Sequence, residues 1–445
     1  MDCVSDVGLG QGIPSGLSVG SWHDESAARH YRFADFFAGL GGFHVGLSKL
    51  GHECVFACEL DDDLREVYQQ NFGIRPEGDI RSVKETDVPP HDILCAGFPC
   101  QPFSLAGKKK GAACPSSGKL IDDVFRIVKY RQPRYVLLEN VPNVLTIADG
   151  TFWQHIQTSF DALGYEVQHR IYSPLQFGLP QQRNRLFVVA SRCGMEHFDW
   201  PDPTDIDVKP LWQLVLESTA DSRLIEPAKL TTLEKWNELL PELDGLSSHT
   251  LIASEFGATY PLDGLSPGRP WRSLHGSFGV PLGGLPDRET VIQALPHYAA
   301  NNVNGKPPEW MRKSILYSRT VYQKNPEFFD EWKKGMVKLP NSWHKLEWRG
   351  DRAQRNIWKQ TIQFRASGIR IMRPEMAPSL VAMTPTQTPI IGSARRYLGV
   401  KEAASLQALD CLRAFPANQA RAFKALGNAV NARIVYEIAH NLLSK

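Results

Sequence analysis

The sequence predicts an α/β fold, with a doubly wound, mostly parallel sheet followed by a second, irregular domain. Between residues 32 and 200, short apolar runs alternate with amphipathic stretches. Strands alternating with helices in this way are typical of parallel sheets. Near Pro201 the alternation stops, and residues 205–370 are rich in Trp, Pro, Gly and charge. The length of 445 residues also exceeds one ordinary hydrophobic core, so two domains are expected.

The individual elements follow from local periodicity. Apolar runs predict strands at 33–37, 54–58, 93–96, 135–138 and 185–190. Helical spacing predicts helices at 43–50, 62–71, 120–130 and 152–163, and, after the irregular region, at 400–407 and within 422–443. Residues 1–30 are Gly/Ser-rich without periodicity, which predicts a mobile tail. We place the first domain at 31–204, the second at 205–390 and a C-terminal segment at 391–445.

Composition narrows the class of protein. The net charge is +2, and the eight cysteines are scattered without a second metal-like pair, so no metal site is expected. No apolar run approaches about 18 residues, which disfavours a membrane span and favours a cytoplasmic protein. Basic clusters at 108–110, 349–355, 365–373 and 395–396 favour a polyanionic partner.

The stretch from Gly97 to Ser104, with the sequence GFPCQPFS, is the most informative of the chain. It places Cys100 directly after Pro99, behind an apolar run that predicts a buried strand. Open α/β sheets carry their chemistry at the carboxyl ends of strands, and a nucleophilic thiol needs such a partly exposed position. A small buried cysteine is the alternative interpretation of this residue alone.

A glycine turn and two acids indicate a nucleoside site. The turn from Gly39 to Gly42 follows a predicted strand and lets a ligand approach the backbone closely. Glu59 ends the second strand, where an acid can accept both ribose hydroxyls, and Asp79 could hold an adenine amino group. Because the third glycine of a dinucleotide site is replaced by His44, a cofactor without a pyrophosphate is expected, namely S-adenosylmethionine.

Two further motifs place charged groups at strand ends. Glu139 ends the strand at 135–138, where partial burial would raise its pKa and let it donate a proton. Arg183 and Arg185 lie two residues apart in an extended segment, so they point the same way and could bind a base oxygen and brace the backbone. Structural ion pairing is an equally good interpretation of these arginines in isolation.

In order along the chain, these motifs resemble those of the cytosine-5 DNA methyltransferases, in particular the prokaryotic restriction-modification type. The resemblance covers roughly 32–200 and 395–440. The matching segments are FAGLGG at 37–42, Glu59, GDI at 78–80, GFPCQPFS at 97–104, ENV at 139–141, QQRNR at 181–185, EAASLQ at 402–407 and GNAV at 427–430.

The resemblance implies the fold of S-adenosylmethionine-dependent methyltransferases and assigns roles to residues. The catalytic residues would be Cys100, Glu139, Arg183 and Arg185. The cofactor-binding residues would be Phe37, Gly39, Leu40, Gly41, Glu59, Leu60, Asp79, Ile80, Pro99, Asn428 and Val430. The last two belong to a C-terminal motif that returns to the first domain.

The implied reaction is covalent methylation of cytosine. The Cys100 thiolate would add to carbon 6 while Glu139 protonates ring nitrogen 3 and Arg185 binds the base oxygen, with Arg183 supporting the site. The base must flip out of the duplex, and residues 101–119, with the lysines at 108–110, would close over the DNA. Leu60 departs from the aromatic residue of some members, and Ser117-Gly118 departs from their Arg-Gly.

The expected partner is double-stranded DNA, read at a short sequence by residues 205–390. By resemblance, the chain would be a monomer in a prokaryotic cytoplasm, functionally paired with a restriction endonuclease. Two alternatives stay open, namely a tRNA cytosine-5 methyltransferase and a catalytically silent DNA-binding protein of the same fold.

Overall fold

The computed structural model describes residues 29–99, 120–203, 208–214, 223–245, 250–263, 271–301, 306–380 and 387–443. The expected nucleophile Cys100, the expected closing loop 101–119 with its lysines, and the tail before residue 29 lie outside these described residues.

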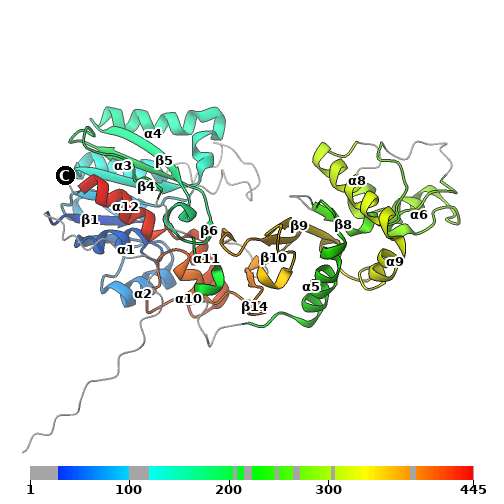
Figure 1. Cartoon of the computed structure of the whole chain (residues 1–445). Coiled ribbons are helices and arrows are strands. Elements are labelled where there is room, and N and C mark those ends of the chain that lie inside the picture. Colours follow the sequence, from blue (N-terminus) through cyan, green and yellow to red (C-terminus); the bar gives the residue numbers. More distant parts are fainter. Residues whose placement is uncertain are drawn as a thin grey trace, which may run out of the picture.

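A mixed α/β sheet occupies the first part of the chain (Figure 1, left). Within the described residues it has six strands in the order β2-β1-β3-β4-β7-β5. Their bounds are β1 Arg32–Phe36, β2 Glu53–Cys58, β3 Ile93–Ala96, β4 Tyr135–Asn140, β5 Glu166–Tyr172 and β7 Arg185–Ser191. All five predicted strands are present, each within a few residues of its expected bounds.

The directions of the strands correct part of the prediction. Strands β2, β1, β3 and β4 are parallel, whereas β7 runs antiparallel to both β4 and β5. Strand β5 was not predicted, because most of its side chains are exposed or half-buried and the segment shows no apolar run. The edge of the sheet beyond β4 is therefore antiparallel.

Helices cover both faces of this sheet. Their bounds are α1 Gly42–Ser48, α2 Asp62–Phe72, α3 Leu120–Arg131, α4 Thr151–Ala162, α10 Val400–Ser405, α11 Gln419–Asn428 and α12 Ala432–Leu443. Helices α3 and α4 bury residues such as Val124 and Phe160 in one core. Helices α1 and α12 bury Phe43 and Ile434 in the core of the other face. Each face thus contributes a separate hydrophobic core to the same sheet.

The C-terminal segment packs directly against the start of the chain, and Figure 1 shows α12 (red) beside the blue strands. A Cβ on Gly42 would lie 2.2 Å from the carbonyl oxygen of Val430, and one on Gly46 would lie 2.7 Å from Val435. These glycines permit the close approach of α1 and α12. The segment 422–443, expected to carry one helix, contains the end of α11 and all of α12.

A second sheet lies where the sequence predicted irregular structure, so that expectation was wrong. The described residues form strands in the order β14-β13-β10-β11-β9-β8, of which only the β9–β11 pair is parallel. The bounds are β8 Thr250–Ile252, β9 Lys345–Arg349, β10 Thr361–Arg365, β11 Gly368–Met372, β13 Ile390–Ile391 and β14 Arg396–Tyr397. Strand β14 lies beyond residue 390, where the second domain was expected to end.

Helices complete this second part of the structure. Their bounds are α5 Pro227–Leu239, α6 Arg288–Gln293, α7 His297–Ala300, α8 Glu309–Lys324 and α9 Pro326–Lys334. Trp236 of α5 and Trp332 of α9 pack with Trp348 and Ile369 of the sheet in one core. A two-residue parallel pairing of β6 (Gln181–Gln182) with β12 (Ala377–Pro378) joins the two parts of the chain.

Candidate active site

The glycine turn after β1 depends on left-handed backbone geometry. Phe37, Gly39 and Gly41 all have positive φ angles, of 56°, 53° and 80°. A Cβ on Gly41 would lie 2.4 Å from the ring of Phe72, so a larger residue would collide there. Among the described residues, a Cβ on Gly39 would meet one atom within 4 Å, the carbonyl oxygen of Phe37. The backbone at Gly39 therefore borders open space, which is what a cofactor needs for close approach.

Glu59 is held beside this turn by backbone amides. The N–H of Gly39 donates to Oε2 of Glu59 at 2.8 Å, and the N–H of Asp61 donates to Oε1 at 3.0 Å. The carboxylate is thereby fixed at the end of β2 with acceptor capacity left over. Leu60 follows with 68% of its surface exposed, so its side chain is available to a ligand at the same edge.

Asp79 lies close to Glu59, because Glu77 pairs with Cys58 beside β2. Its side chain is engaged: it accepts from the N–H of Arg81 at 3.0 Å and from that residue's guanidinium. Those hydrogen bonds lower the pKa of Asp79 below its usual value. Ile80 is buried in the core below. An adenine amino group at Asp79 would share this carboxylate with Arg81.

The C-terminal motif reaches the same place. Val430 is 7% exposed, and a Cβ on Gly97 would lie 3.2 Å from its side chain. Asn428, the last residue of α11, is exposed. Leu40, within the turn, is only 1% exposed. Its side chain packs in the core with α10 and α11 and is not available to a ligand.

Glu139 and Arg185 form a buried pair at the ends of β4 and β7. Nε of Arg185 lies 3.1 Å from Oε1 of Glu139, and the Glu139 side chain is 8% exposed. Burial raises the pKa of Glu139, although Arg185 and Arg183 oppose this shift. Burial also lowers the pKa of Arg185. Within the described part of the chain, Oε1 of Glu139 has no well-aligned hydrogen bond, so a buried polar atom is left for another partner.

Arg183, which was expected to support the site, contacts the C-terminal motif. Its guanidinium donates to the carbonyl oxygens of Gly427 at 2.8 Å and Ala429 at 3.1 Å, and to Oγ of Ser379 at 3.1 Å. Burial, with the nearby charge of Arg185, lowers the pKa of Arg183 to about 9. Arg183 is thus a positioning residue that ties the loop before β7 to the C-terminal motif.

Asn140, which we did not select from the sequence, connects Glu139 to the segment that precedes Cys100. Its Nδ2 donates to the carbonyl oxygen of Phe98 at 3.0 Å. A Cβ on Gly97 would lie 3.9 Å from Oε2 of Glu139, and Pro99 is exposed. The sequence signal was its place directly after Glu139 in the ENV motif.

A buried polar cluster below the glycine turn was also missed. Asp35 of β1 is fully buried, and the hydroxyl of Tyr68 donates to its Oδ2 at 3.3 Å. That hydroxyl also lies 2.7 Å from Nδ1 of His44. Burial raises the pKa of Asp35 well above its usual value and lowers the pKa of His44 to about 4. The group therefore favours neutral forms below the cofactor turn.

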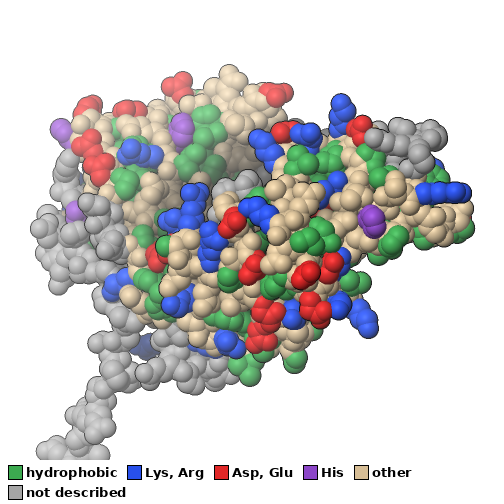
Figure 2. All heavy atoms as spheres, turned by 45° about the vertical axis from the view of Figure 1, so that its right-hand side comes forward, with side chains coloured by type: hydrophobic (Ala, Val, Ile, Leu, Met, Phe, Trp, Pro, Cys, Tyr) green, Lys and Arg blue, Asp and Glu red, His purple; other side chains and the backbone are tan. Residues whose placement is uncertain are grey.

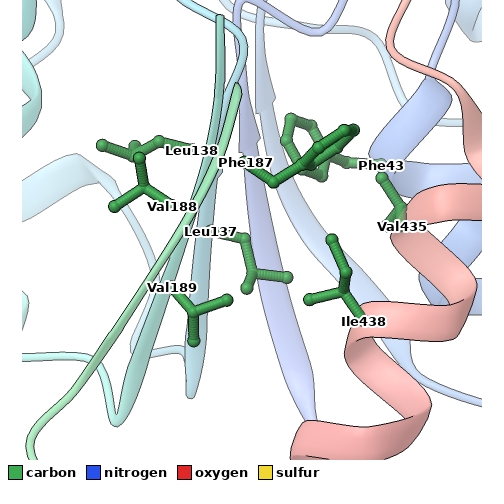
Figure 3. A pocket seen from close by; sticks show the side chains of 8 residues that line it. All are labelled: Phe43, Leu137, Leu138, Phe187, Val188, Val189, Val435 and Ile438. Carbon is green, nitrogen blue, oxygen red and sulfur yellow. The ribbon is translucent and has the colours of Figure 1, made fainter. Parts of the chain in front are cut away.

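Figure 3 shows a small apolar gap between the first sheet and α12. Leu137 and Phe187 point toward Val435 and Ile438, whereas Leu138 lies on the other side of the sheet. The gap holds about 10 Å³, near the lower limit for one water molecule, and has no polar lining. It is a packing feature of the core and lies apart from the polar groups above.

The described ranges contain no group of three or more His, Cys, Asp or Glu side chains that could hold a metal ion. None of the helices in these ranges has the length and apolar character of a membrane span.

Comparison with known proteins matches residues 31–255 to the family described as C-5 cytosine-specific DNA methylase. The type II methyltransferase M.HhaI of Haemophilus parahaemolyticus is 42% identical over 178 residues, covering 40% of this chain and 54% of that protein. M.HaeII of Haemophilus aegyptius is 41% identical over 175 residues, covering 39% and 54%. The chain therefore spans about half the length of these two relatives.

A further relative matches over most of its length. The type II methyltransferase M.AluI of Cellulosimicrobium cellulans is 29% identical over 485 residues, covering 92% of this chain and 91% of that protein. Among solved structures, the methyltransferase EhMeth of Entamoeba histolytica has a TM-score of 0.53 at 12% identity, covering 93% of this chain and 98% of that one. A putative DNA modification methyltransferase from an E. coli prophage has a TM-score of 0.50 at 17% identity, covering 92% and 98%. These structures share the fold.

Proposed function

The chain belongs to the family of C-5 cytosine-specific DNA methylases, and we propose that it transfers methyl from S-adenosylmethionine to carbon 5 of cytosine in a short duplex DNA sequence. The observation that carries this proposal is the buried Glu139–Arg185 pair, 3.1 Å apart, with one carboxyl oxygen left without a hydrogen bond among the described residues. Asn140 ties the same strand end to Phe98, two residues before Cys100. An acid, a base-binding cation and the segment that leads to the candidate nucleophile are thus held at one strand end.

The chemistry follows from these groups. The Cys100 thiolate forms a bond to carbon 6 of the cytosine ring, and the displaced ring electrons move to carbon 5. Glu139, whose pKa is raised by burial, donates a proton to ring nitrogen 3, so that negative charge does not accumulate on the ring. Arg185 donates to the base oxygen. After carbon 5 has received the methyl group, its proton passes to solvent and the bond to Cys100 breaks, while ring nitrogen 3 returns its proton to Glu139, which releases 5-methylcytosine and the thiolate.

The cofactor site fits S-adenosylmethionine, which supplies the methyl group when bound. The Glu59 carboxylate, oriented by the amides of Gly39 and Asp61, is suited to accept ribose hydroxyls. The open space at Gly39 and the exposed Leu60 offer room for the nucleoside. Asp79 and Ile80 border the adenine end. The remaining contacts would come from the site residues Phe37, Gly41, Pro99, Asn428 and Val430.

Residues 205–390 are the proposed recognition domain for duplex DNA. Residues 31–204 are the proposed doubly wound catalytic domain, and the C-terminal segment 391–445 returns to it. The relatives above are named as type II methyltransferases, which supports functional pairing with a restriction endonuclease. We propose that the protein acts as a monomer and needs no complex with that enzyme.

The test is bisulfite sequencing of plasmid DNA from cells that express the chain or its Cys100→Ala variant. We expect full cytosine protection within one short motif, and loss of that protection in the variant. Cys193→Ala is the matched control, because Cys193 is an exposed free thiol distant in sequence from the motif. If the folded wild type binds S-adenosylmethionine but protects no cytosine, the DNA proposal fails, and the tRNA and silent-binder alternatives take its place.

A further inference from the structure

The register of the second sheet gathers charged side chains on one face. Glu347 and Arg349 of β9 are two residues apart, so they point to the same side. Arg370 of β11 pairs in register with Glu347 and lies opposite Gln363 of β10, two residues before Arg365. Three arginines from three strands therefore share a face with one glutamate.

These arginines converge on the carboxylate of Glu347. Nε of Arg349 lies 2.5 Å from Oε1, whereas Oε2 accepts from Arg365 at 2.5 Å and from Nε of Arg370 at 3.1 Å. One carboxylate cannot neutralise three guanidinium groups, so two positive charges remain uncompensated. We call Glu347, Arg349, Arg365 and Arg370 the arginine cluster.

Burial and charge make this cluster a preorganised one. Although burial opposes its ionisation, Arg370 and Arg365 hold the pKa of Glu347 below its usual value, so it is an anion at neutral pH. Burial, followed by the like charge of Arg370, lowers the pKa of Arg365. The arginines would therefore repel one another without Glu347. Arg349, with 49% of its side chain exposed, is the most accessible of the three.

The opposite face of the sheet is committed to the hydrophobic core. Leu346 and Trp348 of β9 and Ile369 and Ile371 of β11 are buried there, against α5 and α9. Figure 2 shows Lys and Arg side chains gathered around a hollow between the two parts of the molecule. A polyanion with regularly spaced charges complements such a surface, and the phosphate backbone of duplex DNA is one.

We infer that the arginine cluster docks on the phosphate backbone of duplex DNA, and that Glu347 is a positioning residue that orients the arginines and limits their attraction to DNA of any sequence. This inference rests on the proposed function, since it takes duplex DNA as the substrate. Beyond the proposed function, it names the face of the second sheet that contacts the phosphate backbone of DNA. It also names Glu347 as a residue that controls selectivity.

The experiment measures binding of the full-length protein to a mixed-sequence duplex by fluorescence anisotropy between about 50 and about 200 mM salt. Glu347→Gln removes the negative charge and should tighten nonspecific binding, with a salt slope steeper by about 0.9, or about threefold more loss of affinity over this range. Arg349→Gln should weaken binding and make the slope shallower by a similar amount. Glu238→Gln, at an exposed ion pair on α5, is the control for charge alone.

Opposite changes in the two variants, with wild-type behaviour of the control, would support the inference. Unchanged slopes, or weaker binding by both variants, would overturn it, and Arg349→Gln alone decides the docking face if Glu347→Gln does not fold. Bisulfite sequencing of the wild type separates the two levels. A wild type that methylates DNA while the variants bind as it does would refute only this inference, whereas a wild type that neither methylates nor binds duplex DNA would refute the proposed function as well.

Discussion

Each of the two sheets carries a glutamate beside arginines, and the two carboxyl groups differ in the direction of their pKa shift. The pKa of Glu139 in the first sheet is raised, whereas that of Glu347 in the second is lowered. Their side chains are similarly shielded, at 8% and 14% exposure. Glu139 has one guanidinium within ion-pair distance, and Glu347 has three. At Glu347 the guanidinium groups outweigh burial, whereas at Glu139 burial outweighs the charges of Arg185 and Arg183.

The difference assigns the two residues to different tasks. A carboxyl group whose pKa is raised by burial, against the charges of Arg185 and Arg183, is suited to donate a proton to a substrate. A carboxylate inside three guanidinium groups stays an anion and can only orient them. Asp35 extends the series to a buried acid that contacts no cation, and its pKa is raised well above the usual value.

The largest expected effect separates the two glutamates by activity. Glu139→Gln keeps the shape of the side chain but cannot transfer a proton, so single-turnover methylation should slow by about 10²- to 10⁴-fold. Duplex binding should stay within about tenfold of the wild type, because Glu139 is buried in the first sheet. Glu238→Gln on α5 serves as the control. If Glu139→Gln methylated DNA at the wild-type single-turnover rate, Glu139 would not be the proton donor. The two glutamates would then no longer differ in the tasks assigned to them.

Five strands of the first sheet could be predicted from the sequence because they are buried on both faces, unlike β5. Such strands are short apolar runs, as in residues 93–96 and 135–138, and the motifs at their ends name the site residues. What could not be predicted depends on tertiary contacts. Arg183 belongs to the correct motif, yet its partners lie about 200 residues or more further along the chain.

The second sheet could not be predicted because its strands are short and far apart in sequence. β8 ends at Ile252 and its partner β9 begins at Lys345, and the described residues between them form four α-helices. The basic residues of the arginine cluster were recognised as clusters of charge, but their shared face depends on strand register. Glu347 carried no sequence signal, since a lone glutamate between Leu346 and Trp348 is most often a solvated charge.

The second expected effect concerns Asp35, the buried acid whose pKa is raised chiefly by burial. The folded protein keeps the proton of Asp35 to a higher pH than the unfolded chain does, so the wild type loses stability as pH rises between the two pKa values. Asp35→Asn does not titrate. The free energy of unfolding of the variant should therefore rise relative to that of the wild type between about pH 5 and about pH 8, by at most about 1.4 kcal/mol per pH unit, and its melting temperature should rise with it.

Thermal unfolding across this pH range provides the measurement for Asp35. Asp161→Asn is the control, because Asp161 is an exposed residue of α4. If the melting temperatures of Asp35→Asn and the wild type changed with pH in the same way, Asp35 would be ionised in the folded protein. In that case, burial alone would not raise the pKa of an acid in this sheet, and the series from Asp35 to Glu347 would break at its first member.

The smallest expected effect concerns the other end of the series. Arg370→Gln removes one of the three cations around Glu347, so the pKa of that carboxyl should rise toward its ordinary value. A lowered folded pKa contributes stability that is present at neutral pH and is lost as pH falls. Because these groups are partly solvated, the expected loss of unfolding free energy at pH 7 is only about 0.5–1 kcal/mol.

Urea unfolding at about pH 7 and about pH 4 measures this loss. The free energy of unfolding of Arg370→Gln should fall below that of the wild type by less at about pH 4 than at about pH 7. Arg312→Gln, on an exposed position of α8, should match the wild type at both pH values. A deficit of equal size at both pH values would mean that Arg370 acts by packing, and the count of cations would no longer explain why Glu347 and Glu139 differ.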